Sequence, residues 1–463
     1  MPRITINSSF YLDNNELSAF RKGDLEIHCM SMRLERPAPK EVKYLGAGFI
    51  RQITSNKFEF VMYSKKLTSA TDILEDVFGS DELRPGQLIP KSHYYKLTSI
   101  DEQNRKWTIG NILHPNRKAS ENGTIINGYF DEMGFKANLP KKVEKDYLSL
   151  EFLGEHKIPT NISTQTEKTV GGKQVASSSS LNILQFSNNK KDFSLRNEDG
   201  RLQVEIRSKQ KMAENYETKI TEALQFVLGR PLTWSIMVKQ HRKKRQIVLK
   251  ASPKNGARGI NPPVNATLGI ETHFCNLFST YLAYICSSES TRIHPISSQT
   301  RSITLANSIN VETLALVLSV AVEGILKYIN TQTSLSESEL KSIEDARKYF
   351  TNWGGSKRFT ARINGLLRSI LENPGAKDVL NELTNARITT PRHKGAWDIL
   401  RNKLAHGGRM GSTSLQEFLD LTNTVLILFY HLVFHIIGYQ GSFPDYSIKG
   451  WPERNYPLDE NYL

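Results

Sequence analysis

Cysteine is scarce in this sequence. The 463 residues contain three cysteines, Cys29, Cys275 and Cys286, and no CxxC spacing. An odd and sparse set excludes the disulfide framework of a small secreted protein, so we expect a reducing, cytoplasmic location. The first twenty residues also lack the continuous apolar run of a secretory signal peptide, which agrees with that expectation.

Long apolar runs are also missing. The most apolar segment, TVLILFYHLVFHIIG (424–438), is shorter than the roughly 18 apolar residues that a membrane-spanning helix needs. We therefore expect a buried helix and no membrane contact. Its two histidines, His431 and His435, have the spacing to share a zinc ion, but no third ligand suggests itself. Packed or interface histidines are the favoured interpretation.

The signatures of common catalytic sites are absent as well. The sequence contains no HExxH motif, no P-loop, no GxGxxG after an apparent strand and no GxSxG. These absences argue against zinc peptidases, P-loop NTPases, dinucleotide-binding enzymes and α/β-hydrolases. We expect neither a metal nor a cofactor.

Positive charge is in excess. Lysine and arginine number 61 against 47 aspartate and glutamate, which gives a formal net charge of +14. Such an excess favours anionic partners, of which nucleic acid is the commonest, with anionic membrane surfaces and acidic proteins as alternatives. Hydrophobic residues at 38% and charged residues at 23% are typical of globular domains. The length predicts about two to four of them.

The first half, residues 1–252, has the pattern of a β-rich domain. Short apolar or alternating runs between turn residues predict strands. These runs lie at 43–50, 56–64, 94–113 with a turn at 101–104, 123–130, 146–154 and 200–208. The stretch 160–180, rich in Ser, Thr and Gly, predicts a long polar surface loop, and 215–229 predicts a helix. Whether the half forms one domain or two stays open.

The densest basic run is KQHRKKR (239–245), between strand-like runs at 232–238 and 246–252. This arrangement predicts a hairpin with a cationic tip. Four cations fall at or beside the expected turn: Arg242, Lys243, Lys244 and Arg245. The tip is either simply solvated or contacts phosphates, because clustered cations release counterions when they bind nucleic acid. A nuclear localisation signal has the same composition.

A Pro- and Gly-rich stretch, 253–269, predicts a linker, and residues 270–463 then change to helical periodicity. Helices are expected at 272–287, 310–329, 336–353, 359–371, 376–387, 394–406 and 414–439. The last is apolar nearly all round, which places it inside a bundle or inside one shared with a second copy. The fold class is therefore α+β multidomain, with a β-rich N-terminal domain followed by an all-α helix bundle.

The segment DILRNKLAHGGRM (398–410) mixes charged and apolar residues at the expected end of a helix. Positions i, i+3 and i+7 should face the core: Trp397, Leu400 and Leu404. Asn402 and His406 are four apart and are therefore neighbours on the helix surface, and Gly407-Gly408 permits a sharp turn that exposes the imidazole. Spacing alone does not distinguish a catalytic Arg401–His406 pair from a histidine that caps the helix.

Further charged residues accompany this segment. The flanking cations are candidate nucleic-acid contacts: Arg392, His393, Lys394, Lys403 and Arg409. Glu323 interrupts the apolar face of the expected helix 310–329. It either pairs with Arg401 or Lys403 inside the bundle or faces solvent.

The string Arg401-Asn402-x-Leu404-x-His406-Gly407 resembles the signature of HEPN domains, in which an arginine and a polar residue precede a histidine by a short gap. The resemblance covers roughly 270–463. The tail YQGSFPDYSIKG (439–450) is similar to the ending of the ApeA-like, anti-phage branch of this superfamily, and ALQFVLGRPLTW (223–234) is weakly similar in style.

This resemblance implies a metal-independent RNA endonuclease. His406 would be the general base or acid acting on the 2′-OH, Arg401 the phosphate clamp and Asn402 an orienting residue, with 2′,3′-cyclic phosphate and 5′-OH ends as products. One histidine per chain implies a homodimer with a composite site. The branch implies a bacterial abortive-infection role, with the β-rich domain sensing a phage-derived trigger.

Two other functions fit the same residues. Arg401 and His406 could bind nucleotide or RNA without cleaving it, or the β-rich domain could bind a partner while the bundle merely dimerises. Salt-dependent RNA binding without a cyclic-phosphate product would favour the first alternative. An infection assay that Arg401→Ala leaves unchanged would favour the second.

Overall fold

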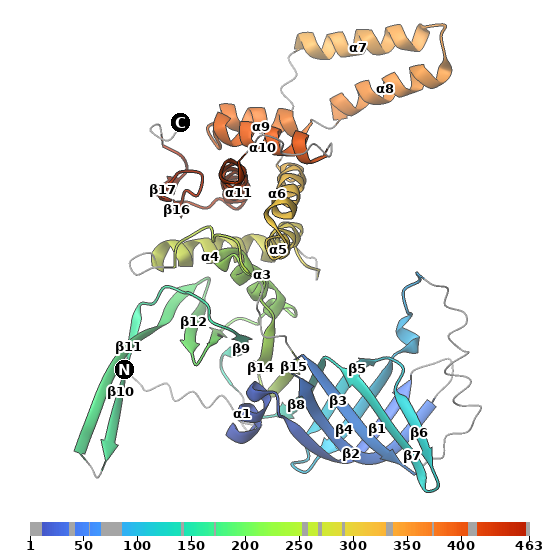
Figure 1. The fold of residues 1–463 in the computed structure, drawn as a ribbon, viewed down its shortest axis with the longest axis vertical. Helices are drawn as coiled ribbons and strands as arrows, with labels where there is room; N and C mark the ends of the chain where they lie inside the picture. Colours follow the sequence, from blue (N-terminus) through green and yellow to red (C-terminus); the bar gives the residue numbers. More distant parts are fainter. Residues whose placement is uncertain are drawn as a thin grey trace. The chain divides into compact units, whose positions relative to one another are not determined.

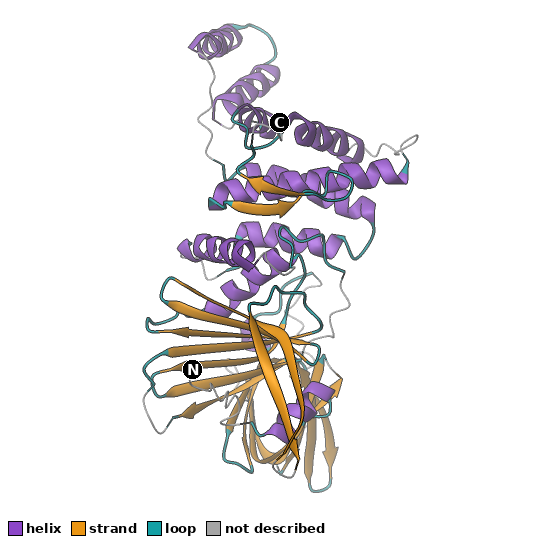
Figure 2. Cartoon of the chain, turned by 90° about the vertical axis from the view of Figure 1, so that its left-hand side faces the viewer, coloured by secondary structure: helices purple, strands orange, loops and turns teal. Residues whose placement is uncertain are grey.

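The structure, a computed structural model, describes residues 12–36, 42–54, 56–65, 86–139, 143–170, 173–251, 258–266, 271–288, 292–329, 337–372, 375–405 and 414–459. The chain divides into two compact units: Met1–Glu217 with Leu232–Gly256, and Thr218–Pro231 with Ala257–Leu463. Most strands belong to the first unit and most helices to the second (Figures 1 and 2). This is the two-part α+β layout expected from the sequence.

An antiparallel sheet makes up most of the first unit. Its strands are β1 (Glu26–Arg36), β2 (Val42–Thr54), β3 (Lys57–Ser64), β4 (Tyr95–Asp101), β5 (Lys106–Ile112), β6 (Asn116–Ser120), β7 (Gly123–Phe130), β8 (Glu132–Asn138), β9 (Asp146–Leu153), β10 (Ile162–Val170), β11 (Lys173–Asn188), β12 (Lys191–Glu198), β13 (Arg201–Ser208), β14 (Trp234–His241) and β15 (Lys244–Lys250). A short 3-10 helix, η1 (Lys91–His93), precedes β4. The spatial order is β10-β11-β12-β13-β9-β14-β15-β8-β5-β4-β1-β2-β3-β7-β6. The runs expected to be strands correspond to β2, β3, β4, β5, β7, β9 and β13.

Part of this sheet curls back on itself. β7 pairs with β3, β8 pairs with β5, and Asp131 alone separates β7 from β8. Strands β8, β5, β4, β1, β2, β3 and β7 therefore follow one another in a ring (Figure 1). Alternate side chains point into the ring, because successive residues of a strand face opposite sides. They form a continuous core that includes Phe60, Leu97 and Trp107.

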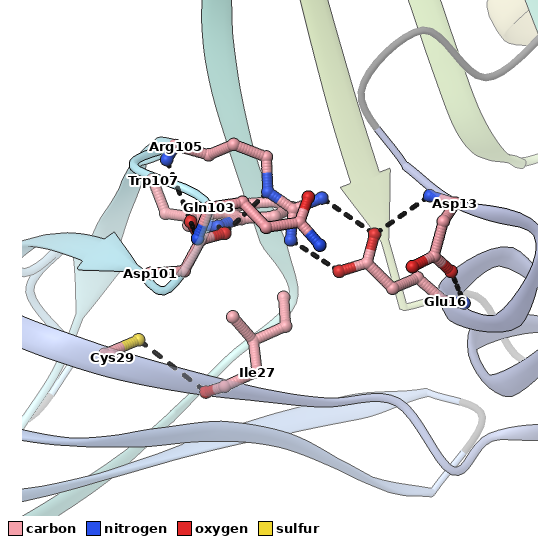
Figure 3. Close-up of polar contacts among 8 residues, drawn as sticks. All are labelled: Asp13, Glu16, Ile27, Cys29, Asp101, Gln103, Arg105 and Trp107. Atoms are coloured by element: carbon pink, nitrogen blue, oxygen red, sulfur yellow. Dashed lines mark hydrogen bonds and ion pairs between the residues drawn. The ribbon is translucent and has the colours of Figure 1, made fainter.

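Helix α1 (Asn14–Lys22) is joined to this core by packing and by charge. Phe20 is buried, and its ring centroid lies 6.2 Å from that of Phe58. The Arg105 guanidinium donates to Glu16 of α1 at 2.7 Å and to Asp101 at 2.6 Å (Figure 3). Since the side chains of Arg105 and Asp101 are 7% and 3% exposed, each compensates a charge that would otherwise be buried alone.

The prediction of a polar surface loop at 160–180 is wrong. β10 and β11 form a long antiparallel hairpin, with Ile162 opposite Ile183 at one end and Val170 opposite Lys173 at the other. The Ser/Thr-rich sequence lacks the apolar alternation that marks a half-buried strand, but the backbone hydrogen bonds of a hairpin do not require that pattern. Threonine is also a favourable strand residue.

The second unit is helical. Its elements are α3 (Tyr216–Leu228), α4 (Glu271–Ser287), α5 (Pro295–Ala306), α6 (Val311–Leu326), α7 (Glu337–Asn352), α8 (Lys357–Glu372), α9 (Ala376–Asn385), α10 (Pro391–Ala405), α11 (Leu415–Ile437), β16 (Gly441–Pro444) and β17 (Glu453–Tyr456). Every expected helix has a counterpart, and α5 is additional. Asn310 caps α6 as expected, because its side chain accepts a hydrogen bond from the amide of Thr313.

Two segments assigned elsewhere from the sequence belong to the helical unit. Most of α3, expected within the N-terminal half, lies in this unit, where Phe226 stacks on Tyr281 with ring centroids 4.3 Å apart. Residues 258–266 were expected to be a linker, but their side chains Ile260 and Val264 are buried. The partners of both segments follow them by many residues: Tyr281 stacks on Phe226, and the hydroxyl of Tyr430 donates to the carbonyl of Asn261. A local sequence pattern does not show such contacts.

Helix α11 is the centre of the helical unit. It is long and apolar enough to span a membrane, but 72% of its most apolar window is buried inside the protein. It packs against α6, α10 and α4, which confirms the expectation of a buried helix. Ser414 begins it with a capping box completed by Glu417.

Replacement of Arg105, the cation shared by Glu16 and Asp101, should destabilise the first unit strongly. In Arg105→Met, the carboxylates of Asp101 and Glu16 lose their shared partner, and we expect the free energy of unfolding to fall by roughly 3–5 kcal/mol. Urea denaturation measures this change. Arg33→Met is the matched control, since the Arg33–Glu35 pair is at the surface, and should cost about 0–1 kcal/mol. Equal effects of the two substitutions would contradict the assigned role of Arg105.

Candidate functional site

Helix α10 places the expected motif at the edge of the helical core. Trp397 and Leu400 are fully buried, as the spacing predicted, and Leu404 is half-buried. The helix packs against α6, α11 and α9. Asn402 and Lys403, in its last turn, are exposed. The motif helix therefore has one face in the core and its functional candidates outside the core.

Arg401 lies between these two faces and is held from two sides. Its Nε atom lies 3.2 Å from a carboxylate oxygen of Glu323 on α6, which is one of the arrangements expected for that glutamate. Its guanidinium carbon lies 5.2 Å from the centroid of the Trp397 ring, within cation–π range. The indole is itself fixed, because its N–H donates to the carbonyl of Ser319 at 3.1 Å. With 42% of its side chain exposed, Arg401 is oriented and still accessible.

The other half of the motif falls outside the described residues. The structure describes α10 as far as Ala405 and resumes at Ser414. His406 and Arg409 lie in the interval, so their predicted roles rest on the sequence.

The prediction that His393 contacts nucleic acid is wrong. This residue is 1% exposed, and its Nδ1 atom lies 2.8 Å from the hydroxyl of Thr390. Its ring meets that of His431 edge to face, with centroids 5.0 Å apart. Burial lowers the pKa of His393 to about 4 and that of His431 well below its usual range. His393 is therefore a neutral core residue at physiological pH.

The C-terminal tail completes this core, a contribution that the sequence did not indicate. The His431 ring lies 5.0 Å from Phe443 of β16 and 5.6 Å from Tyr456 of β17, between centroids. Arg392, at the start of α10, donates to the backbone carbonyl of Ser447 in the same tail. The aromatic content of the tail was the available signal.

The remaining candidates are distributed over both units. Lys394 is half-buried on α10, and His435 is exposed at the end of α11, so His431 and His435 do not share an environment. The basic run at 239–245 forms the expected strand, turn and strand in the first unit. Three of its cations are exposed and one is half-buried: Arg242, Lys243, Lys244 and Arg245. Their contact with phosphate stays a prediction.

The buried histidines should make the stability of the helical unit depend on pH. Above about pH 6.5 both the folded and the unfolded chain hold these groups neutral. Below it the unfolded chain binds protons that folded His393 and His431 reject, so stability falls as the pH drops toward about 4. The slope is at most about 1.4 kcal/mol per pH unit for each histidine.

His431→Phe should reduce this slope, since phenylalanine suits the aromatic neighbours and binds no proton. Urea denaturation at pH 7, 6 and 5 measures it. Thr422→Val, at a buried position of the same helix, should leave the slope unchanged because neither side chain binds a proton in this pH range. A wild-type slope in His431→Phe would refute the assignment.

Comparison with known proteins does not test the resemblance to HEPN domains. No protein-family model, curated protein or solved structure matches this chain. Any functional assignment therefore rests on the residues of the motif and on the chemistry of the helix that carries Arg401.

Proposed function

We propose that this chain is a metal-independent RNA endonuclease of the HEPN type. The observation that carries the proposal is the position of Arg401 near the end of α10, where Glu323 and Trp397 orient a guanidinium that remains 42% exposed. The sequence places Asn402 beside it and His406 five residues beyond it. An arginine and a histidine so placed suit the cleavage of a phosphodiester.

RNA supplies its own nucleophile, which makes a small set of residues sufficient. His406 takes the proton from the 2′-OH, the oxygen attacks the adjacent phosphorus, and the P–O5′ bond breaks. Negative charge develops on the non-bridging oxygens, where the planar guanidinium of Arg401 binds as a fork. The leaving 5′-oxygen takes up a proton. The products carry a 2′,3′-cyclic phosphate and a 5′-OH.

The ion pair with Glu323 is compatible with this role. The two side chains are 42% and 39% exposed, and exposed pairs contribute only about 0–1 kcal/mol. A phosphate with a better geometric match to the guanidinium can therefore replace the carboxylate. Glu323 would then hold Arg401 in position until substrate arrives.

A second copy of the chain would supply the second proton-transfer group. Exposed apolar side chains support such a contact on the two helices that carry Glu323 and Arg401: Leu316 and Val320 of α6, and Ile399 of α10. We propose a cytoplasmic homodimer that acts in bacterial anti-phage abortive infection. The β-rich unit would respond to a phage-derived trigger.

The pairing of Arg401 with Glu323 also favours one alternative, in which Arg401 and His406 bind RNA and leave it intact. Oriented binding requires the same accessible guanidinium but no proton transfer. The nature of the RNA ends formed distinguishes the two functions.

Substitution of the motif should abolish cleavage and leave the fold in place. With structured RNA, chelator and phage lysate, we expect Arg401→Ala to reduce the cleavage rate by roughly 10²–10³-fold, and His406→Ala by at least as much. Arg401→Lys should recover little, because lysine lacks the fork. The measurement is the appearance of 2′,3′-cyclic phosphate and 5′-OH ends.

Lys377→Ala is the matched control. Lys377 forms an exposed ion pair with Asp398 of α10 at 3.6 Å, so its loss perturbs the same helix without touching the motif, and cleavage should persist. If the wild-type protein binds RNA in a salt-dependent way but yields no cyclic phosphate under any of these conditions, the binding-module alternative replaces the nuclease. Total RNA from infected cells carrying wild type or Arg401→Ala provides the corresponding test in vivo.

A further inference from the structure

Helices α7 and α8 form a hairpin, here called the arm (residues 337–372; Figure 1). The two helices contact each other, and Asn364 of α8 donates to the hydroxyl of Thr351 of α7 at 3.2 Å. Phe350 and Ile363 are half-buried. From 338 to 368, where side chains of the arm are described, none is buried. The arm therefore presents nearly all of its surface outward.

Charge on the arm is divided between its two ends. Residues 346–371 contain six cations and no acidic residue: Arg347, Lys348, Lys357, Arg358, Arg362 and Arg368. The acidic residues of the arm lie outside that span: Glu337, Glu339, Glu344, Asp345 and Glu372. Among the described residues, no ion pair joins the first five cations to a carboxylate. The tip of the arm, residues 347–362, therefore carries five cations, and within the described residues none of them is held in an ion pair.

Aromatic rings are interleaved with these cations. Tyr349, Trp353 and Phe359 are 66%, 42% and 50% exposed. The rings of Trp353 and Phe359 meet edge to face, with centroids 5.5 Å apart and planes at 62°. An edge-to-face contact covers one face of one ring, whereas a stacked pair covers one face of each, and both rings here stay substantially exposed. Large exposed rings of this kind, at three positions around one helical connection, indicate a binding surface.

We propose that the tip of the arm binds single-stranded RNA. Aromatic faces stack on unpaired bases, with little preference among them, and neighbouring lysines and arginines contact the phosphates. A duplex hides its base faces, so single strands or loops are the partners that this surface fits. The inference deepens the proposed function, because it identifies a surface that would engage the RNA substrate away from Arg401.

An anionic membrane is the other class of partner that cations and aromatic rings attract. A helix that lies in a membrane interface turns a continuous apolar face toward lipid. On α8, Ile363 and Leu367 are half-buried and Leu366 is 62% exposed, so the described side chains of this helix form no continuous exposed apolar face. The exposed rings at the tip are instead separated by cations, which favours a polyanion with alternating flat and charged groups.

The test uses the full chain carrying Arg401→Ala, which keeps the RNA intact, and measures binding by fluorescence anisotropy. The probe is a labelled single-stranded RNA of about 12 nucleotides, within the usual range for one such site. Trp353→Ala with Phe359→Ala should weaken binding roughly tenfold or more. Arg358→Ala with Arg362→Ala should weaken it and also reduce the slope of log affinity against log salt by about 0.7 for each phosphate that the variant no longer binds.

Matched controls lie in the acidic half of α7, away from the tip. Leu340 and Lys341 are exposed, so Leu340→Ala and Lys341→Ala remove an apolar and a cationic side chain outside the tip. Both should bind RNA like the parent protein. Because side chains of the arm are not buried, all four variants should keep the parent's thermal unfolding curve.

Equal RNA affinity in parent and tip variants would overturn the proposal. The proposal would also be overturned if the tip variants lost binding to vesicles of anionic lipid while their RNA binding stayed unchanged. A third contrary result would be duplex RNA that binds as tightly as single strands and is insensitive to the aromatic substitutions. Failure of the proposed nuclease is a separate outcome: tip-dependent RNA binding by a wild-type chain that never yields cyclic phosphate would retain the arm as an RNA-binding surface and remove the cleavage.

Discussion

Helix α11 is apolar around nearly its whole circumference, and the helical unit is arranged to keep it from water. Helices α6, α10 and α4 pack against it, and the tail covers a further side, where Phe443 and Tyr456 contact His431. Burial is complete enough that this histidine is held neutral. Helix α10 must therefore present its apolar side to the core, and Trp397 and Leu400 do so. Arg401 follows from that constraint, because it lies at the border between the packed and the solvated side.

A residue at such a border has properties that neither the core nor the open surface provides. A fully buried arginine would need a permanent carboxylate partner and would not be released to bind substrate. A fully exposed arginine would lose rotamer freedom each time it bound. Arg401 is held by the indole of Trp397 and by Glu323 and still reaches solvent. Part of the cost of ordering its side chain is thus met when the helices fold.

Sequence periodicity predicted the elements that carry a buried face. Alternating runs became β4 and β5, apolar residues at helical spacing became α6 and α11, and Asn310 and Ser414 began these helices. Glu323 was marked by its place on an apolar face, and it contacts Arg401. The hairpin β10–β11 was not predicted because its strands are joined by backbone hydrogen bonds and lack the alternation of apolar residues that marks a half-buried strand. The burial of His393 was not predicted because its environment is built by His431 and the tail, which no local pattern connects to α10.

Net charge alone does not locate a binding site for a polyanion, because ion pairs within the fold decide which cations are available. Part of the densest basic run, 239–245, is tied into the fold: Lys239 pairs with Glu217 at 3.2 Å, His241 contacts Asp146 at 2.7 Å, and Arg245 donates to Gln240. Arg242, Lys243 and Lys244, at its turn, are exposed. The charge of Arg105 is likewise neutralised by its buried ion pairs with Glu16 and Asp101. The five cations at the tip of the arm are more widely spaced in the sequence. Within the described residues no ion pair joins them to a carboxylate, and exposed rings accompany them. Since counterion release depends on charge that the protein has not already neutralised, paired cations such as Lys239 and Arg105 contribute less to the binding of a polyanion than the exposed cations at the tip of the arm and at the turn 242–244.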